Sequence, residues 1–285
     1  MTRGDIAITG ATGNLGGLVA RMVHAKGAPE RLLARTPSRA PMLDSTPVRH
    51  FDYADRTASR TALDGARIAF MVSGPEAPDR VDHHKTFIDA AMDAGVQHIV
   101  YTSFVAAAPD AVFTLARDHF ETEEHIKATG VRWTFLRDSF YMDFMSALVG
   151  DDGAIRGPAD NGSCAVVARY DVARAAAAVL VSPDQHAGHA YDMTGPAALT
   201  LEDIARELSD ATGGRIVYSP ETTAEAYASR AHFGAPDWQV AAWVSTYLAF
   251  ASGDMAHASG DIEKITGSPP MSFREFLSRQ TLERH

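Results

Sequence analysis

The sequence predicts an α/β fold built on a doubly wound parallel sheet, and three observations predict it. Short apolar segments alternate with longer segments of helical periodicity through the first half of the chain. Six such apolar segments occur before about residue 138, enough for a sheet of this kind. A glycine-rich turn directly follows the first of them and opens the first helical segment.

The predicted strands are short and mostly apolar, and several end in a Gly, Asp or Ser turn. They are Ile6–Thr9, Arg31–Ala34, Val48–Phe51, Arg67–Val72, His98–Thr102 and Arg132–Arg137. Between them, apolar residues recur at helical spacing, as in Leu15, Leu18, Val19, Met22 and Val23. Helices of this kind are expected to cover the faces of the sheet and to give a Rossmann-type fold.

The pattern changes after about Asp138, where glycine-rich turns are mixed with helical segments. We expect a first domain of residues 1–137, to which some later segments return, and a smaller α/β lobe of residues 138–285. In the second lobe, Thr200 precedes a helical segment with Asp203 in its third position, an imperfect capping box. An aromatic stripe at helical spacing indicates a helix packed on a core and consists of Trp243, Tyr247 and Phe250.

Composition excludes several classes of protein. Of 285 residues, 46% are hydrophobic and 22% are charged, as in a folded globular protein. The net charge of −10 and the lack of a basic run argue against binding to nucleic acid or anionic lipid. The single Cys164 excludes an intrachain disulfide and fits a reducing compartment. We find neither a signal peptide nor a membrane-spanning segment, so we expect a cytoplasmic protein. A homodimer is the commonest assembly of such proteins and is the one to test.

The strongest motif is the glycine turn between the first strand and the first helix. A pyrophosphate needs backbone N–H donors at close range and a helix N-terminus directed at it. Side chains at Gly10 or Gly13 would obstruct that approach, and one at Gly16 would push the helix from the strand. We expect a dinucleotide to bind here, with a purely structural turn as the alternative. The expected contacts are Gly10, Thr12, Gly13, Asn14, Leu15 and Gly16.

Residues after the later strands predict which dinucleotide binds. An acidic residue at the end of the second strand would favour NAD, whereas this chain has Arg35, whose guanidinium suits the 2′-phosphate of NADP(H). A solvated surface arginine is the alternative. Asp52 and Tyr53 follow the third strand, where an aspartate is placed to accept from the adenine amino group, and both are expected to contact the cofactor. We expect residues 1–137 to form an NADP-binding domain, with further cofactor contacts from Val72, Ser73, Gly74, Thr102 and Ser103.

An ordered set of motifs resembles one known family. The set includes Ile8–Gly16, Ala34–Pro37, Phe51–Tyr53, Ser73–Pro75, Tyr101–Ser103, His119–Glu123, Thr134–Arg137 and Ile265–Pro270. Over nearly its whole length the chain resembles the NmrA-like branch of the atypical short-chain dehydrogenases, the type 2 quinone oxidoreductases and triphenylmethane reductases in particular. The resemblance implies a Rossmann domain, a smaller C-terminal lobe and a substrate cleft.

The catalytic pair of the orthodox short-chain dehydrogenases is missing. Those enzymes use Tyr-x-x-x-Lys as a proton relay, but none of the four lysines here has a tyrosine four residues before it. The resemblance instead places His119 and Glu123 on the corresponding helix, one turn apart, so that Glu123 would orient the imidazole. A structural pair is the alternative. Tyr141 is a further candidate acid or base.

Aromatic residues after the strands predict the class of substrate. Expected pocket walls are Pro75, Phe104, Phe140, Tyr141 and Phe144, although core packing would explain any one of them. A quinone or a cationic dye is already electrophilic and can accept hydride directly, so the missing relay favours such acceptors. We therefore expect an NADPH-dependent oxidoreductase acting on a quinone-like or other conjugated, electron-poor small molecule.

Two other functions remain open from the sequence. The first is a non-catalytic protein that senses NADP(H) and regulates a partner, which the missing catalytic pair also suits. The second is a non-redox isomerase, lyase or cyclase on the same fold. Metal chemistry is not expected, because the twelve histidines are scattered and the chain has no zinc-protease motif.

Overall fold

The computed structural model describes residues 5–283, with side chains as far as residue 280. The helices and strands of the first half are β1 (Ile6–Ile8), α1 (Asn14–Ala25), β2 (Glu30–Ala34), η1 (Pro37–Arg39), β3 (Val48–His50), α2 (Arg56–Leu63), β4 (Ile68–Met71), α3 (Arg80–Asp93), β5 (His98–Phe104), α4 (Thr114–Ala128) and β6 (Arg132–Asp138). Those of the second half are α5 (Met142–Met145), η2 (Ser146–Leu148), β7 (Ala154–Gly157), β8 (Ser163–Cys164), α6 (Arg169–Val181), η3 (Pro183–Gln185), β9 (His189–Met193), β10 (Leu199–Thr200), α7 (Leu201–Thr212), β11 (Val217–Pro220), α8 (Thr223–Arg230), η4 (Ala231–Phe233), α9 (Asp237–Ser252), α10 (Asp261–Thr266) and α11 (Phe273–Glu283). Within residues 5–283, no helix has the length and apolar character needed to cross a membrane.

The chain divides into two compact units. Unit 1 comprises Met1–Phe104, Asp118–Arg137 and Tyr170–Tyr191, and unit 2 comprises Val105–Arg117, Asp138–Arg169 and Asp192–His285. Contacts between residues define these units, and such contacts do not show whether either unit folds by itself. The predicted domain division after residue 137 therefore stays a prediction.

A seven-stranded sheet with the order β3-β2-β1-β4-β5-β6-β9 forms the centre of unit 1. The pairs β2–β3, β1–β2, β1–β4 and β4–β5 are parallel. The first six strands follow the Rossmann order, so the predicted fold class is confirmed, and so is each of the six predicted strands. The seventh strand, β9, was not predicted, because its His-Ala-Tyr-Asp-Met sequence lies beyond the regular alternation and carries polar residues.

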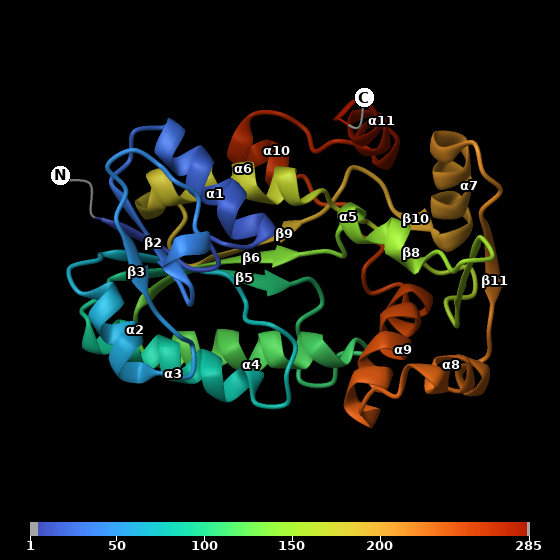
Figure 1. The fold of residues 1–285 in the computed structure, drawn as a ribbon, viewed down its shortest axis with the longest axis horizontal. Coiled ribbons are helices and arrows are strands. Elements are labelled where there is room, and N and C mark those ends of the chain that lie inside the picture. The colour runs from blue at the N-terminus through green and yellow to red at the C-terminus, as the bar shows by residue number, and fades with distance from the viewer. Residues whose placement is uncertain (1–4, 284–285) are drawn as a thin grey trace. The chain divides into compact units, whose positions relative to one another are not determined.

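Helices cover both faces of this sheet, as Figure 1 shows, with α1 and α6 on one face and α2, α3 and α4 on the other. One apolar core lies beneath α2 and α3 and includes Phe87 and Ile88 of α3, Tyr101 of β5 and Phe135 of β6, all fully buried. Burying these large side chains drives the helices onto the sheet. The strand ends are thereby held in fixed positions for the residues that follow them.

Unit 2 contains two small sheets and several helices. Strand β7 pairs in parallel with β11, and β8 pairs antiparallel with β10. The predicted capping box at α7 is confirmed, since the Thr200 hydroxyl accepts from the Asp203 N–H at 3.0 Å and the Asp203 carboxylate accepts from the Thr200 N–H at 3.1 Å. The predicted packing of the α9 stripe is confirmed for Tyr247 and Phe250, which are 7% and 1% exposed, whereas Trp243 is partly exposed.

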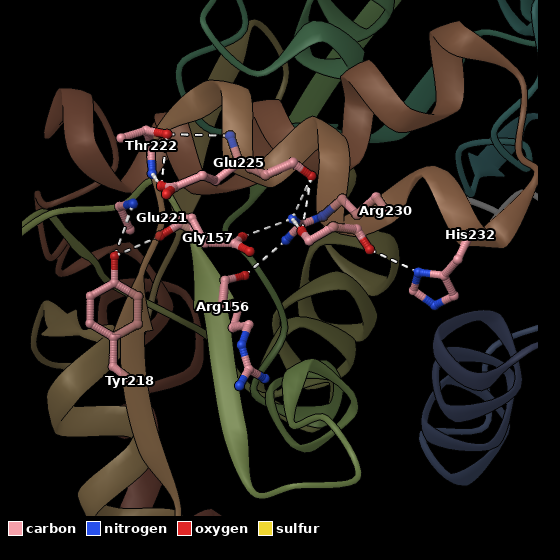
Figure 2. Close-up of polar contacts among 11 residues, drawn as sticks. Arg156, Gly157, Tyr218, Glu221, Thr222, Glu225, Arg230 and His232 are labelled. Carbon is pink, nitrogen blue, oxygen red and sulfur yellow. Dashed lines mark hydrogen bonds and ion pairs between the residues drawn. The ribbon is translucent and has the colours of Figure 1, made fainter.

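The buried guanidinium of Arg230 joins β7, α8 and α9 within unit 2, and Figure 2 shows its hydrogen bonds to Arg156 and Glu221. It donates to the Arg156 carbonyl at 2.8 Å and to the Glu221 carboxylate at 3.1 Å. It also lies 4.9 Å from the ring centroid of Tyr247. Because each partner comes from a different segment, this arginine fixes the small β7–β11 sheet against the helices that follow it.

Candidate functional site

The ends of neighbouring strands meet at one edge of the sheet in unit 1. Ile8, at the end of β1, is in register with Leu32 of β2 and with Phe70 of β4. Met71 of β4 is likewise in register with Tyr101 of β5. Since these strands are parallel, the segments that follow them lie along the carboxyl edge, where ligands bind in open α/β sheets. The predicted cofactor residues of unit 1 all lie in or beside these segments.

The glycine turn at this edge has no room for side chains at its key positions. A Cβ on Gly16 would lie 2.3 Å from the Gly10 carbonyl oxygen, so only glycine allows α1 to start this close to β1. Gly10 has a φ of +63°, which disfavours other residues, and a Cβ there would meet Val72 at 3.0 Å. Gly13 caps α1 without a side-chain hydrogen bond, and Thr12 to Asn14 are exposed. The first N–H groups of α1 are therefore open to an anion, and the turn fits the close approach of a pyrophosphate.

Arg35 directly follows β2 and is exposed. Nδ1 of His50, in β3, donates a hydrogen bond of 3.0 Å to the Arg35 carbonyl. The backbone carbonyl of Arg35 is thus held by His50, while the residue itself is exposed to solvent. A cation held at this edge suits the 2′-phosphate role that the sequence predicts.

Asp52 and Tyr53 are placed differently from one another. Asp52 shapes the turn after β3, because its carboxylate accepts from the Ala54 N–H at 3.0 Å. The Tyr53 hydroxyl instead points into the protein, donating to the Val72 carbonyl and lying 2.8 Å from the Thr9 hydroxyl. Burial raises the pKa of Tyr53 above its ordinary value. The hydroxyl of Tyr53 is thus used inside unit 1, and the cofactor contacts of both residues stay predictions.

The segment that leaves β4 is held by side chains on its neighbouring strands. The Val72 N–H donates at 2.8 Å to the hydroxyl of Thr9, which directly follows β1, and the Ser73 N–H donates to the Thr102 hydroxyl of β5 at 2.8 Å. These two amides sit at the carboxyl edge where the sheet ladder ends. Side chains at the ends of both flanking strands therefore fix the path of the segment that carries Ser73 and Pro75.

Two residues of α3 hold the next peptide of the same segment. The Gly74 N–H donates to His84 Nε2 at 2.8 Å, and Arg80 Nε donates to the Gly74 carbonyl at 3.0 Å. His84 Nε2 accepts, so its Nδ1 carries the proton and donates to the Thr122 hydroxyl at 2.9 Å, which in turn donates to the Asp118 carbonyl at 2.7 Å. Sequence reasoning missed Arg80 and His84, although their spacing of four residues on one helix indicated a shared polar face.

His119 lies in the same buried network. An arginine has only donors, so His119 Nε2, 3.0 Å from the Arg80 guanidinium, must accept. Its Nδ1 then carries the proton and donates to the Tyr101 hydroxyl at 2.9 Å. Burial, with the Arg80 charge as the second cause, lowers the pKa of His119 well below its usual value. His119 is neutral, 6% exposed, and has both ring nitrogens engaged inside the protein.

Glu123 does not orient His119, and this part of the prediction is wrong. The Glu123 carboxylate accepts from the Ser103 hydroxyl at 2.6 Å and from two nitrogens of Arg137 at 2.9 and 2.7 Å. A fully buried carboxylate needs a cation, which Arg137 supplies and a neutral imidazole does not. His119 and Glu123 therefore form hydrogen bonds with different residues beside α4. Their catalytic roles, and the cofactor contact of Ser103, stay predictions.

The predicted substrate residues fall into both units. In unit 1, Pro75 is exposed and Phe104 stacks on His119 with ring centroids 5.9 Å apart. In unit 2, Phe140 stacks on Phe250 at 5.8 Å, and Phe144 is 47% exposed. Each set is described within its own unit, and a pocket shared by all of them stays a prediction.

Tyr141 has a partner that the sequence did not predict. Its hydroxyl makes a hydrogen bond of 2.5 Å to Oδ2 of Asp138, the last residue of β6. Burial raises the pKa of Asp138 from 3.8 to about 8. The signal that was available is a carboxyl residue at the end of an apolar strand, three positions before a tyrosine. Among the described residues, no group of three or more His, Cys, Asp or Glu side chains is arranged to hold a metal.

The comparisons with known proteins agree with this geometry. The model of the NmrA-like family matches residues 2–237. The chain belongs to the NmrA-like family. It is 32% identical over 280 residues to quinone oxidoreductase 2 of Escherichia coli K12. The similar region covers 96% of this chain and 97% of that protein.

Two solved structures are similar over almost the whole chain. One is the NADPH complex of an NADPH-dependent quinone oxidoreductase from Escherichia coli, with a TM-score of 0.88, 32% identity and coverage of 97% of this chain and 99% of the other. The other is a triphenylmethane reductase from Citrobacter sp., with a TM-score of 0.85, 31% identity and coverage of 98% and 99%. These similarities extend through both units of this chain.

Proposed function

We propose that this protein is an NADPH-dependent oxidoreductase that transfers hydride to a quinone-like or other conjugated, electron-poor small molecule. The observation that carries the proposal is the glycine turn. Its positions have no space for side chains, and the first N–H groups of α1 are therefore accessible to an anion. Arg35 on the neighbouring strand end supports NADP(H) over NAD(H). When bound, NADPH supplies hydride from C4 of its nicotinamide.

The fixed segment after β4 supports a redox role for unit 1. Thr9, Thr102, His84 and Arg80 hold the backbone of Val72, Ser73 and Gly74 with hydrogen bonds of 2.8 to 3.0 Å. Hydride transfer depends on the distance and alignment of two carbon atoms, so a rigid wall beside the nicotinamide is what such a reaction requires. We assign Arg80 and His84 as positioning residues.

The substrate class follows from what the chain lacks and from what it resembles. No Tyr-x-x-x-Lys pair is present in the sequence, so acceptors that take hydride without prior protonation are favoured. The similar proteins are named for reduction of quinones and of triphenylmethane dyes. Phe140 and Phe144, with their aromatic faces, suit flat conjugated molecules of this kind.

The experiment is to follow NADPH consumption at the nicotinamide absorbance with a panel of quinones and cationic dyes. We expect turnover with at least one acceptor from the panel and slower turnover with NADH. A protein that binds NADPH but consumes none with any acceptor would overturn the proposal. That outcome would turn attention to the sensing function, in which a partner binds according to the cofactor state.

We further propose that the protein acts in the cytoplasm as a homodimer, with a small molecule rather than a nucleic acid as its ligand. The net charge of −10 and the single buried Cys164 support the ligand class and the compartment. Cell fractionation tests the compartment, and analytical ultracentrifugation tests the assembly.

A further inference from the structure

Asp138 carries a buried carboxyl group, and only one of its two oxygens has a hydrogen-bond partner among the described residues. Oδ2 is 2.5 Å from the Tyr141 hydroxyl. Oδ1 is buried and has no hydrogen-bond partner among the described residues. An ionised carboxylate in this position would leave a charged oxygen without solvent or donor, which is costly, so the neutral form is favoured.

The groups around Asp138 do not supply a compensating charge. Ser139 follows it in the chain and lies 3.3 Å from the Cys164 thiol of β8, whose pKa burial raises to about 12. Arg169, at the start of α6, pairs with Asp143 of α5 at 3.6 Å. Burial raises the pKa of Asp138 to about 8, with Tyr141 opposing the shift. Near neutral pH this carboxyl therefore keeps its proton.

The Tyr141 ring is held in place from three sides. Its hydroxyl meets Asp138, and the Arg169 guanidinium lies 4.7 Å from its ring centroid. On the backbone, the Val167 N–H donates to the Phe140 carbonyl at 2.9 Å, and the Met142 N–H donates to the Val167 carbonyl at 2.8 Å. The residue as a whole is nevertheless partly exposed. Tyr141 thus presents a fixed phenol that is backed by a protonated carboxyl.

Position along the chain keeps this pair near the carboxyl edge of the sheet. Asp138 ends β6, and Tyr141 follows three residues later, a span of at most about 11 Å. Strands β5 and β6 are joined by the helix α4, the connection that parallel strands require, and their arrows run the same way in Figure 1. The pair therefore directly follows the carboxyl end of β6, and open α/β sheets bind ligands beyond the carboxyl ends of their strands.

Quinone reduction needs a proton that reduction of a cationic dye does not need. A quinone that accepts hydride becomes a phenolate-type anion, whose oxygen has an ordinary pKa of about 10, as in tyrosine. A carbocationic dye that accepts hydride becomes neutral at once. A nearby acid accelerates the first reaction and has no role in the second.

We propose that Asp138 and Tyr141 form a proton relay that protonates the reduced quinone, an inference that rests on the proposed function. A hydrogen bond between two oxygens, such as that of Tyr141 and Asp138, holds one proton. When the Asp138 carboxyl holds that proton, the phenolic hydrogen of Tyr141 is released to point at a substrate oxygen. Tyr141 is then the catalytic residue, and Asp138 is the group that replaces its proton.

The atoms and electrons of the relay balance. Hydride brings two electrons to the quinone, and no protein group is oxidised or reduced. The O–H bond of Tyr141 breaks as a new O–H bond forms on the substrate anion, and the Asp138 proton moves to the tyrosine oxygen. Solvent water or hydronium then returns a proton to the Asp138 carboxylate. The net transfer from a carboxyl of pKa about 8 to a phenolate of ordinary pKa about 10 is favourable.

The test compares the two classes of acceptor in the full-length protein with NADPH. We expect Tyr141→Phe and Asp138→Asn each to lower the kcat for a quinone by about tenfold to hundredfold. The kcat for a cationic triphenylmethane dye should stay within twofold in both variants. Tyr218→Phe is the matched control, because it removes a unit 2 hydroxyl that bonds the Gly157 carbonyl instead, and both rates should be unchanged.

Two further readouts apply when only quinones turn over. The wild-type kcat with a quinone should fall as the pH rises above about 8, where Asp138 loses its proton, and Asp138→Asn should remove that fall. Wild-type turnover should also slow in D2O more than Tyr141→Phe turnover does. The thermal shift produced by NADPH reports folding and cofactor binding in each variant, independently of activity.

The outcomes separate this inference from the proposed function. Equal losses with quinone and dye would overturn the relay and assign the pair to substrate positioning. Unchanged quinone reduction in both variants would also overturn it, since water would then be the proton donor. A wild-type protein that consumes NADPH with neither acceptor would instead overturn the proposed function itself.

Discussion

The network around His119 in unit 1 and the Asp138–Tyr141 pair in unit 2 are both buried polar groups, yet they are completed differently. Both ring nitrogens of His119 have partners inside the protein, as do both oxygens of Glu123. In unit 2, one oxygen of Asp138 has no partner among the described residues. A completed network holds backbone in place, whereas a buried carboxyl with an unpartnered oxygen favours its protonated form.

The difference shows how burial acts on histidines and on carboxyl groups. Burial removes the charge from His119 by lowering its pKa, and this makes a neutral ring that joins Arg80 to Tyr101. Burial removes the charge from Asp138 by raising its pKa, and this makes a neutral acid. The same physical cause therefore produces a positioning group in one region and a proton donor in the other.

Removing the central cation of the unit 1 network should have the largest effect. Arg80→Met leaves the His119 ring, the Gly74 carbonyl and the Asp118 carboxylate without their donor. We expect the free energy of unfolding, measured with urea, to fall by about 3 kcal/mol. Arg56→Met, which removes an exposed arginine paired with Asp93, is the control and should fall much less. Equal losses in the two variants would show that the buried network does not stabilise the fold.

The second prediction concerns the pH dependence of stability. The pKa of Asp138 is about 8 in the folded protein, against 3.8 ordinarily, so this group stabilises the fold at low pH and the contribution is lost as the pH rises through about 8. Asp138→Asn lacks this dependence. The difference in unfolding free energy between variant and wild type should therefore grow in favour of the variant from pH 5 to pH 8, by at most about 1.4 kcal/mol per pH unit. Parallel curves would mean that Asp138 is ionised when folded.

Replacing the exposed Arg35 should have the smallest effect on stability and a clear effect on NADPH binding. Arg35→Asp should weaken NADPH binding roughly tenfold to hundredfold, because a charge-assisted hydrogen bond to phosphate is lost, and should affect NADH binding far less. Calorimetric titration with both cofactors measures this, and the melting temperature should barely change. Equal losses for NADPH and NADH would assign Arg35 a structural role and sharpen its contrast with Arg80.

The sheet could be predicted because strand and turn signals are local. Ile6–Ile8 and Ile68–Met71 are uninterrupted apolar runs, and the glycine turn reports its own backbone geometry. Strand β9 lacks such a run and pairs only at the edge of the sheet, so its sequence gave no comparable signal.

The partners of the polar residues could not be predicted, because they depend on contacts between distant segments. Arg80 reaches His119 across 39 positions, and Ser103 reaches Glu123 across 20. The family resemblance implied a His119–Glu123 pair four residues apart on α4, but each side chain bonds to different residues beside the helix. For Asp138, the sequence placed a carboxyl at a strand end, and only packing in unit 2 determines that one of its oxygens is buried without a donor.

The most direct measurement is a thermal-shift titration of the purified protein with NADPH, NADP⁺ and NADH in parallel, since a ligand that binds the native state raises its melting temperature. The glycine turn and Arg35 predict a clear rise with NADPH and NADP⁺ and a smaller rise with NADH at the same concentration. No rise with any of the three would contradict cofactor binding at the start of α1, and with it the proposed hydride transfer.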